Sequence, residues 1–407
     1  MRPVKIAAAA AMTLGILAGF AVSAHAQVTA YEGARVIVGN GNVVENGTIV
    51  VDGARIMQVG SAADVKVPGN AKRVSLSGKT VIPMLIDTHV HLSGKRETVI
   101  RDLKQRAYWG VSTAMSMGTD NVELLPMRDE VIPGAARFLS AGRGITRKEP
   151  LRPTFQIDTE EEARKAVQQN AAWKIDIIKI WVDDRDGKVQ KITPAQYAAI
   201  IDEAHKLKIR TTAHIFNMED AKGLMRAGLD SFAHGVRDRD VDDETVSMFK
   251  ERPHLFLIPN LPDRGVKVDR SWLRPGMSAE EFAKLETENM DRPKVNAFHN
   301  IQARNLAKMN TAGVRITMGT DGNRPWGPHE EMEDMVLAGM TPAQVLVSST
   351  RNGADFLRIA DAGTLEAGKS ADLLVLDANP LDDITNTRRI SLVVLRGAPV
   401  DRSQPVQ

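Results

Sequence analysis

Two histidines one residue apart, His89 and His91, end an apolar run that begins at Val81. Because a β-strand alternates its side chains between two faces, a strand over this run would point both imidazoles the same way at its carboxyl end. Neutral imidazole is the commonest metal ligand in proteins. The pair therefore predicts a metal ion held by a rigid strand, with polar lining or an unrelated pairing as the alternative.

Four further residues that can bind a metal or carry a proton also end apolar, strand-like runs. In chain order they are Lys179, His214, His234 and Asp321. Each has an ordinary explanation alone: an ion-paired lysine, a core histidine bonded to backbone, or an aspartate that caps a helix. A lysine on an inward face is costly unless it is paired or modified. Together with the His-x-His pair, the set predicts a metal centre at successive strand ends.

This combination resembles the amidohydrolase superfamily, and the resemblance covers nearly the whole chain after the first 26 residues. It implies an α/β fold, a TIM-like (β/α)8 barrel with its metal centre at the carboxyl ends of the strands. In the two-metal members of the family, His89 and His91 would hold the first metal together with Asp321. His214 and His234 would hold the second metal.

The resemblance also implies that Lys179 carries carbon dioxide as a carbamate that bridges both ions. An ammonium cannot ligate a cation, whereas a carbamate offers two anionic oxygens. The two divalent ions are expected to be Zn²⁺, with manganese, cobalt or iron as alternatives. A metal-activated hydroxide would attack a carbonyl carbon, and Asp321 would be the catalytic residue that passes the proton to the leaving group. His329 is the next candidate for that proton transfer.

Several neighbouring residues are candidates for supporting roles. Asp87, on the strand face of His89, either orients a metal ligand or is a buried structural acid. Trp181, on the face of Lys179, either flanks the substrate or only packs. An arginine near the mouth could hold a substrate carboxylate through two hydrogen bonds. The arginines placed there are Arg143 and Arg147 after strand three, Arg237 after strand six and Arg324 after Asp321.

Within the superfamily, the sequence is most similar to the group of imidazolonepropionase-like proteins and of dipeptidases that cleave Xaa-Pro or Xaa-Arg bonds. The resemblance implies a hydrolase that cleaves an amide C–N bond, with a dipeptide or an N-acyl amino acid as substrate. A lactonase, carboxylesterase or phosphotriesterase would use the same centre, and the metal ligands do not separate these activities. A catalytically silent metal-binding protein is a further alternative, which the complete ligand set disfavours.

Strand-rich segments at both ends of the chain flank a region in which strands and helices alternate. Turn signals such as Asn-Gly and Asp-Gly predict hairpins in residues 27–80, and residues 361–407 have a similar texture. We expect these two segments to build one small β-sandwich, and residues 81–360 to form the barrel around a parallel sheet. Strands are predicted near 84–91, 111–117, 136–142, 175–182, 209–216, 231–235, 255–260 and 314–320, and helices at 160–173, 194–207 and 218–227. Residues 261–298 are expected to form part of a lid.

The first 26 residues resemble a secretory signal peptide. Arg2 and Lys5 precede an apolar stretch over residues 6–22, and Ala24-His-Ala26 has the small-x-small pattern of a cleavage site. An uncleaved membrane anchor is the alternative, but the stretch is short for a span. We therefore expect a periplasmic or secreted protein that is free of the membrane after cleavage. The chain has no cysteine, so it has no disulfide to gain and no thiol to lose there.

Charge and aromatic content limit the expected partners. Without Arg2 and Lys5, the 53 basic residues become 51, equal to the 51 acidic residues. No basic run is long enough to predict nucleic-acid binding, and an aromatic content of 4% argues against a surface that stacks bases. The expected partner is a small-molecule amide or peptide, and a homo-oligomer stays open.

Overall fold

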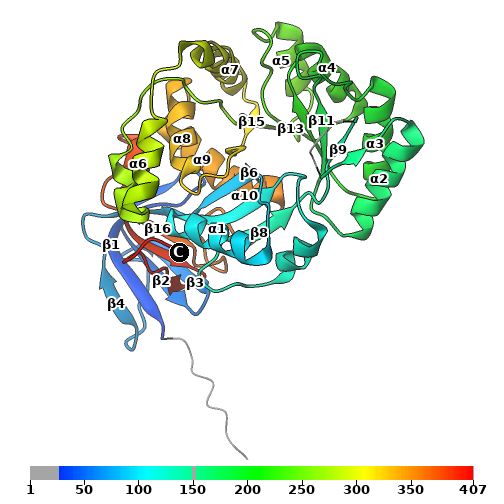
Figure 1. Cartoon of the computed structure of the whole chain (residues 1–407). Helices are drawn as coiled ribbons and strands as arrows, with labels where there is room; N and C mark the ends of the chain where they lie inside the picture. Colours follow the sequence, from blue (N-terminus) through cyan, green and yellow to red (C-terminus); the bar gives the residue numbers. More distant parts are fainter. Residues whose placement is uncertain (1–26, 149–152, 407) are drawn as a thin grey trace, which may run out of the picture.

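The computed structural model describes residues 27–148 and 153–406 (Figure 1). The predicted signal peptide lies outside these residues. Figure 1 shows the strands of both chain ends gathered on one side of the molecule, next to the alternating strands and helices. Within the described ranges, no helix combines the length and the apolar character that crossing a membrane requires.

Both chain ends contribute to one eight-stranded sheet, in the order β18-β17-β16-β5-β1-β2-β3 with β4 beside β1. The first end supplies β1 (Thr29–Ile37), β2 (Val43–Asp52), β3 (Arg55–Ser61), β4 (Lys72–Ser75) and β5 (Thr80–Pro83), and the second supplies β16 (Leu373–Leu376), β17 (Ile390–Leu395) and β18 (Ala398–Pro399). Val36, Val81 and Val375 share one apolar cluster in this sheet. The two ends therefore associate as predicted, while a division of the sheet into two facing layers stays a prediction.

The apolar run that precedes the His-x-His pair is shared between two sheets. Its first residues belong to β5 of the terminal sheet, and β6 (Leu85–Val90) begins in the other part of the molecule. Pro83 has no N–H to continue the ladder, and the Met84 N–H donates to Asp372 O across 3.1 Å. The predicted boundary between the terminal β-sandwich and the barrel, between residues 80 and 81, therefore lies inside β5.

All eight strands predicted for the alternating region are present, and all their pairings are parallel. One sheet has the order β6-β7-β8, and the other has the order β10-β9-β11-β12-β13-β14-β15. The strands after β6 are β7 (Val111–Ser116), β8 (Arg137–Ser140), β9 (Ile145–Thr146), β10 (Phe155–Gln156), β11 (Ile178–Val182), β12 (Thr211–Ile215), β13 (Ser231–Ala233), β14 (Phe256–Ile258) and β15 (Arg315–Ile316). The predicted α/β fold is confirmed.

Backbone hydrogen bonds connect the first of these sheets to the second at both edges of the first, β6 and β8. After β15, the Asp321 N–H donates to His89 O across 2.7 Å. At the opposite edge, the Asp176 N–H donates to Ser140 O across 3.0 Å. The strands therefore follow one another in the order that a barrel requires, and a continuous ladder around the barrel stays a prediction.

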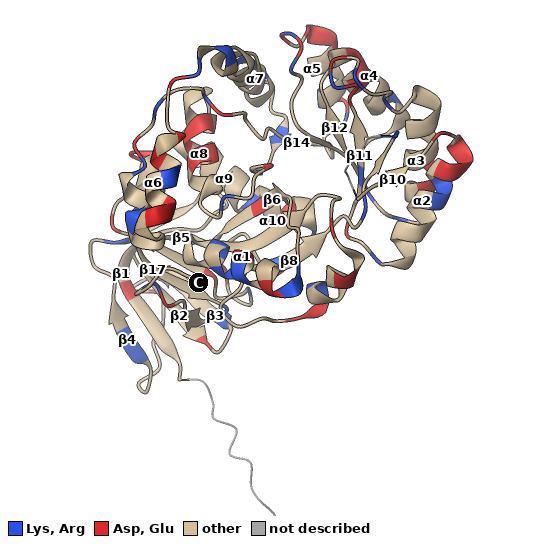
Figure 2. Cartoon of the chain, in the orientation of Figure 1, with Lys and Arg blue, Asp and Glu red and all other residues tan. Residues whose placement is uncertain are grey.

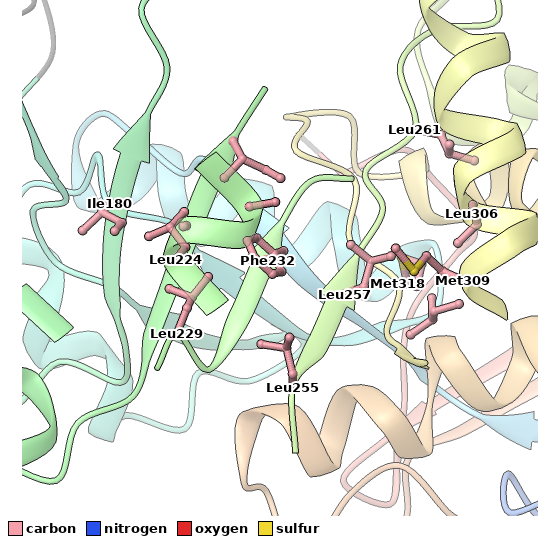
Figure 3. Packing of buried hydrophobic residues seen from close by; sticks show 14 of the residues in the cluster. Ile180, Leu224, Leu229, Phe232, Leu255, Leu257, Leu261, Leu306, Met309 and Met318 are labelled. Carbon is pink, nitrogen blue, oxygen red and sulfur yellow. The ribbon is translucent and has the colours of Figure 1, made fainter. Parts of the chain in front are cut away.

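Helices cover the outer faces of these strands. They are α1 (Arg96–Tyr108), α2 (Glu160–Ala172), α3 (Pro194–Lys206), α4 (Met218–Ala227), α5 (Asp243–Lys250), α6 (Ala279–Thr287), α7 (Pro293–Thr311), α8 (Gly327–Leu337), α9 (Pro342–Ser349) and α10 (Arg351–Leu357). The three helices predicted by sequence, α2, α3 and α4, are confirmed to within one residue. Thr159 and Thr193 start α2 and α3 with capping boxes. Figure 3 shows Leu224 of α4, Phe232 of β13 and Leu257 of β14 within the shared core.

Residues 261–298 contain structure of their own. A short helix, η2 (Ser271–Gly276), precedes α6 and the start of α7, and Leu273 packs with Tyr108 and Trp109 at the end of α1. The Tyr108 hydroxyl donates to Pro275 O across 3.0 Å. The segment is thus anchored to the body of the protein, and its movement as a lid stays a prediction. Figure 2 shows basic and acidic residues intermixed on the outer helices, α6 among them.

Candidate metal centre

The His-x-His pair points at the aspartate that follows the last strand. His89 and His91 face the same oxygen of Asp321, with Nε2–Oδ1 distances of 3.2 and 2.9 Å. Their ring centroids lie 5.2 Å apart. The alternation of β6 therefore directs both imidazoles to one point, as the sequence predicted.

The other predicted residues surround the same point. His234 Nε2 lies 3.4 Å from Asp321 Oδ2, and its ring centroid lies 4.5 Å from that of His214. Lys179 Nζ lies 3.3 Å from His89 Nε2, and the side chain of Lys179 is fully buried. Three residues, His89, His234 and Asp321, offer ligand atoms that all lie within 4.8 Å of one another. The structure thus brings all six predicted residues into one cluster.

The donors in this cluster fit a divalent cation. Both ring nitrogens of His234 are buried and have no hydrogen-bond partner among the described residues, an arrangement that coordination would satisfy. Burial lowers the pKa of His89 and of His214 to about 3, and it lowers the pKa of His234 well below its usual value. These imidazoles are therefore neutral at pH 7, which is the form that binds metal.

Asp321 supplies the anionic donor of the cluster. Burial pushes the pKa of its carboxyl upward, but the facing His89 and His234 side chains hold that pKa well below its usual value. The carboxylate is therefore ionised at neutral pH. Neutral imidazoles with one carboxylate form a mixed nitrogen and oxygen set that suits zinc and similar cations.

Asp87 lies beneath the cluster in a buried network. Its carboxylate accepts hydrogen bonds from Thr320 N and Oγ1, at 3.1 and 2.8 Å, and pairs with Arg106 Nη1 at 3.1 Å. Arg106 also donates to Gly322 O across 3.2 Å. Burial raises the pKa of Asp87 to about 6 against the lowering effect of Arg106. Asp87 therefore combines the two roles considered from sequence: it is a buried acid, and it fixes the turn that carries Asp321.

Three polar contacts of the histidines were not predicted from the sequence. The Asn260 amide lies 2.7 Å from His89 Nδ1, and Thr119 Oγ1 lies 3.1 Å from His91 Nδ1. Asp183 Oδ2 lies 3.1 Å from His214 Nε2. Asn260 follows β14 as the other site residues follow their strands, and this position was the signal available in the sequence. Asp183 directly follows β11 and so carried the same signal.

Unusual backbone conformations mark three neighbouring strand ends. His234, Asn260 and Asp321 have φ values of 151°, 44° and 50°, in the region that favours glycine. They follow β13, β14 and β15, which are adjacent in one sheet. Such conformations persist only where the surrounding structure enforces them, and they concentrate at functional sites.

The predicted substrate-binding residues differ in their surroundings. The Trp181 ring stacks beside His91, with centroids 6.4 Å apart and planes at 24°. Arg237 Nε and Nη2 are buried and lack a hydrogen-bond partner in the part of the chain that the structure describes. Burial lowers the pKa of Arg237 to about 10, so the guanidinium stays charged at neutral pH. Trp181 therefore lies beside the cluster. Arg237 acts on the charge of Asp321 from nearby, and two of its N–H groups are left for a ligand to bind.

The remaining arginines are held in other ways. Arg147 pairs with Asp158 at 3.1 Å, and Arg324 is 42% exposed and lies 3.8 Å from Glu330. The Arg143 N–H donates to Asn170 Oδ1 across 3.2 Å, which fixes its backbone. Nε of Arg143 and Nε of Arg147 are also buried without a hydrogen-bond partner among the described residues.

His329 is wrong as the alternative proton carrier. Its ring is fully enclosed, with Nε2 2.9 Å from Trp109 O and Nδ1 3.1 Å from Thr387 Oγ1. It therefore connects α8 to α1 and to the C-terminal segment. Eight residues of sequence separation from Asp321 cover a turn and a helix start, which carry the side chain away from the cluster.

A cavity of about 340 Å³ adjoins the turn that carries Asp321. Thr320, Gly322 and Arg324 line it from that turn, and Arg264 and Arg270 line it from the 261–298 segment. Arg264 and Arg270 form ion pairs with Asp334 and Glu330, at 2.8 and 3.0 Å. The 261–298 segment thus borders a cavity beside the cluster.

Comparison with known proteins gives consistent matches. A model described as the amidohydrolase family matches residues 80–400. An imidazolonepropionase of Shouchella clausii (strain KSM-K16) is 26% identical over 375 residues, which cover 83% of this chain and 80% of that protein. A "putative prolidase" structure from Bifidobacterium longum has a TM-score of 0.78 at 30% identity, over 94% of this chain and 97% of that one. A Xaa-Pro dipeptidase with bound methionine has a TM-score of 0.73 at 22% identity, over 92% and 99%, and supports the fold.

Proposed function

The chain belongs to the amidohydrolase family, and from this premise we propose that it is a secreted, metal-dependent hydrolase of dipeptides or N-acyl amino acids. It is an enzyme of the class that hydrolyses C–N bonds, as its relatives are. The observation that carries the finer proposal is the cluster of four histidines, one lysine and one aspartate at adjoining strand ends. The signal-like residues 1–26 support a periplasmic address.

We propose that two divalent cations, zinc by default, bind in this cluster. The orphaned nitrogens of His234 and the neutral state of its neighbours support this binding. His214 now contacts Asp183 through Nε2, so a second cation would compete with that contact. His89, His91 and Asp321 would hold the first cation, and His214 and His234 would hold the second.

Lys179 would join the two cations as a carbamate. Its amine would add to the carbon of carbon dioxide, form a C–N bond and release one proton to solvent. Full burial of Lys179 beside His89 supports this, because a buried ammonium is costly whereas a carbamate can bind two cations. We expect Lys179→Ala to lose the second metal and most activity, with partial recovery when short carboxylic acids are added. Full activity of that variant would make Lys179 a structural cation.

The residues of the chain would then divide the catalytic work. Bound cations lower the pKa of water and polarise a carbonyl group. Asp321 would take a proton at a carboxylate oxygen and pass it to the leaving nitrogen. Asp87 and Thr320 hold the turn of Asp321 in place through the buried network, so the carboxylate needs little reorganisation.

Arg237 is the arginine best suited to bind the free carboxylate of the substrate. Two of its nitrogens are buried without a partner among the described residues, against one each in Arg143 and Arg147, and the charges of Asp321 and Asp183 act on its guanidinium. A carboxylate can accept two parallel hydrogen bonds from a guanidinium. The site would therefore select a substrate with a carboxylate near the scissile amide.

Metal content tests the binuclear centre. The protein is reconstituted with Zn²⁺ and bicarbonate, freed of excess metal and measured by elemental analysis. We expect two equivalents per chain. A value of one equivalent or less would overturn the binuclear proposal.

Matched substrates test the chemistry. Dipeptides and N-acyl amino acids are assayed with their carboxylate free or esterified, beside lactones and aryl esters. The free carboxylates should react much faster, since an unpaired buried arginine costs about 2–5 kcal/mol. Equal rates for each pair, or faster turnover of lactones and esters, would move the assignment to lactonase, carboxylesterase or phosphotriesterase activity, which the same cluster could support.

A further inference from the structure

We propose that Asn260 is a positioning residue that sets the tautomer of His89, an inference that rests on the proposed role of His89 as a metal ligand. Asn260 follows β14, the strand next to β15, and its amide lies 2.7 Å from His89 Nδ1. Both side chains are buried, with 5% of Asn260 and none of His89 exposed. The opposite nitrogen of the ring, Nε2, faces Asp321.

A neutral imidazole carries one proton, so its two nitrogens have opposite roles. For Nε2 to bind a cation, the proton must lie on Nδ1, and Nδ1 then needs a hydrogen-bond acceptor. The amide oxygen of Asn260 can be that acceptor. Asn260 with its oxygen toward the ring therefore leaves the Nε2 lone pair of His89 free for a metal.

The observed contact has the other orientation. The amide nitrogen, Nδ2, faces His89 Nδ1, an arrangement that suits a ring with its proton on Nε2, where Asp321 Oδ1 lies 3.2 Å away and Lys179 Nζ 3.3 Å away. A rotation of 180° about the Cβ–Cγ bond of Asn260 exchanges the nitrogen and oxygen of the amide with almost no change in shape. The amide can therefore serve the metal-free ring in one orientation and the metal-binding ring in the other.

Local packing places the amide of Asn260 against the ring of His89. Asn260 Oδ1 is buried and has no hydrogen-bond partner among the residues described, so the present orientation leaves an acceptor unused. Gly319 provides the space: a Cβ there would lie 2.9 Å from His89 Cβ and 3.0 Å from Asn260 Oδ1. The left-handed backbone at Asn260 is one that asparagine adopts more readily than most residues.

Two substitutions separate this role from simple packing. Asn260→Leu keeps the branching at Cγ and removes the acceptor, whereas Asn260→Asp offers acceptors alone when ionised. Asn289→Leu is the matched control, because Asn289 is a buried asparagine whose amide bonds to the backbone of Val268, at 2.7 and 3.0 Å. The dissociation constant for Zn²⁺ is measured by competition with a chromophoric chelator, and thermal unfolding of the metal-free proteins is followed in parallel.

We expect Asn260→Leu to bind its first Zn²⁺ about 10–100-fold more weakly than the wild type. Asn260→Asp should bind at least as tightly as the wild type, and Asn289→Leu should keep wild-type affinity even if it unfolds at a lower temperature. If Asn260→Leu bound Zn²⁺ with wild-type affinity, the inference about Asn260 would be overturned, and the proposed function would not be affected. If Asn260→Leu does not fold, Asn260→Asp decides, and weakened binding there would overturn it. A wild-type protein that binds no Zn²⁺ would overturn the proposed function as well.

Discussion

The two sides of the histidine cluster differ in how their buried polar groups are satisfied. Beneath His89, the carboxylate of Asp87 is bound by Arg106 and by Thr320. After β13, the ring nitrogens of His234 and two nitrogens of Arg237 have no hydrogen-bond partner within the described ranges. We call the first side the frame (Asp87, Arg106, Thr320 and Gly322) and the second the open side (His234 and Arg237).

This difference indicates which side of the cluster would bind a ligand. An unsatisfied buried polar group costs about 1–3 kcal/mol, and a ligand that pairs with such a group removes that cost. In the frame, internal partners remove it, and the frame then fixes the turn of Asp321. On the open side, a cation at His234 and an anionic substrate group at Arg237 would remove it. The frame should therefore control stability, and the open side should control binding.

The largest effect is expected at Asp321, where the two sides meet. Asp321→Asn keeps the shape of the side chain and an oxygen that can ligate, but an amide cannot accept the proton. The loss in kcat should be about 10²–10⁴-fold. Metal content, measured on the same preparation, should stay close to that of the wild type. A kcat near the wild-type value would show that another group moves the proton.

The next effect concerns the stability of the frame. Arg106→Met leaves the buried Asp87 carboxylate without its cation, and breaking a buried pair in this way costs about 3–5 kcal/mol of unfolding free energy. Urea denaturation measures this difference. The double variant Asp87→Leu/Arg106→Met is the control and should recover part of the loss, because the only charge that loses its partner is then Asp102, which is partly exposed to solvent. An unchanged midpoint in Arg106→Met would mean that the frame does not stabilise the fold.

The open side should give the opposite result. Arg237→Met removes a guanidinium that has two unpaired buried nitrogens, so the unfolding free energy should stay equal or rise. The same change should lower kcat/KM for substrates with a free carboxylate. The loss should correspond to a rise of about 2–5 kcal/mol in the activation free energy. The esterified partners should lose much less. Equal losses for both members of each pair would contradict carboxylate binding by Arg237.

The sequence predicted the members of the cluster better than their connections. Strand periodicity predicted that His89 and His91 point the same way, because a side chain in a strand has one of two directions. His234 was placed in the cluster by its position at a strand end and by the resemblance of the whole set to the family. The contact of Asn260 with His89 depends on the spacing of β14 from β6, which no local pattern encodes. The absence of partners around Arg237 depends in the same way on loops that converge only in the fold.

The fold shows the same division. Alternating strands and helices predicted a parallel α/β arrangement and all eight strand positions. The strand predicted near 84–91 corresponds to β6, and the apolar residues before it belong to β5 of the terminal sheet, which ends at Pro83, a residue without an N–H. The 261–298 segment gave a loop-like signal, and its helices formed against α1, where an aromatic cluster buries them.

The smallest effect is expected at Arg324, which serves as the matched control for Arg237. Its side chain is 42% exposed and 3.8 Å from Glu330, so Arg324→Met should change the unfolding free energy by no more than about 0.5 kcal/mol. The kcat/KM of this variant should stay close to that of the wild type, because water already forms hydrogen bonds with the exposed guanidinium. Arg324 nevertheless lines the cavity on the far side of the Asp321 turn. If Arg324→Met lowered kcat/KM more than Arg237→Met for free-carboxylate substrates, the substrate anion would bind in that cavity, and the open side would serve the cations alone.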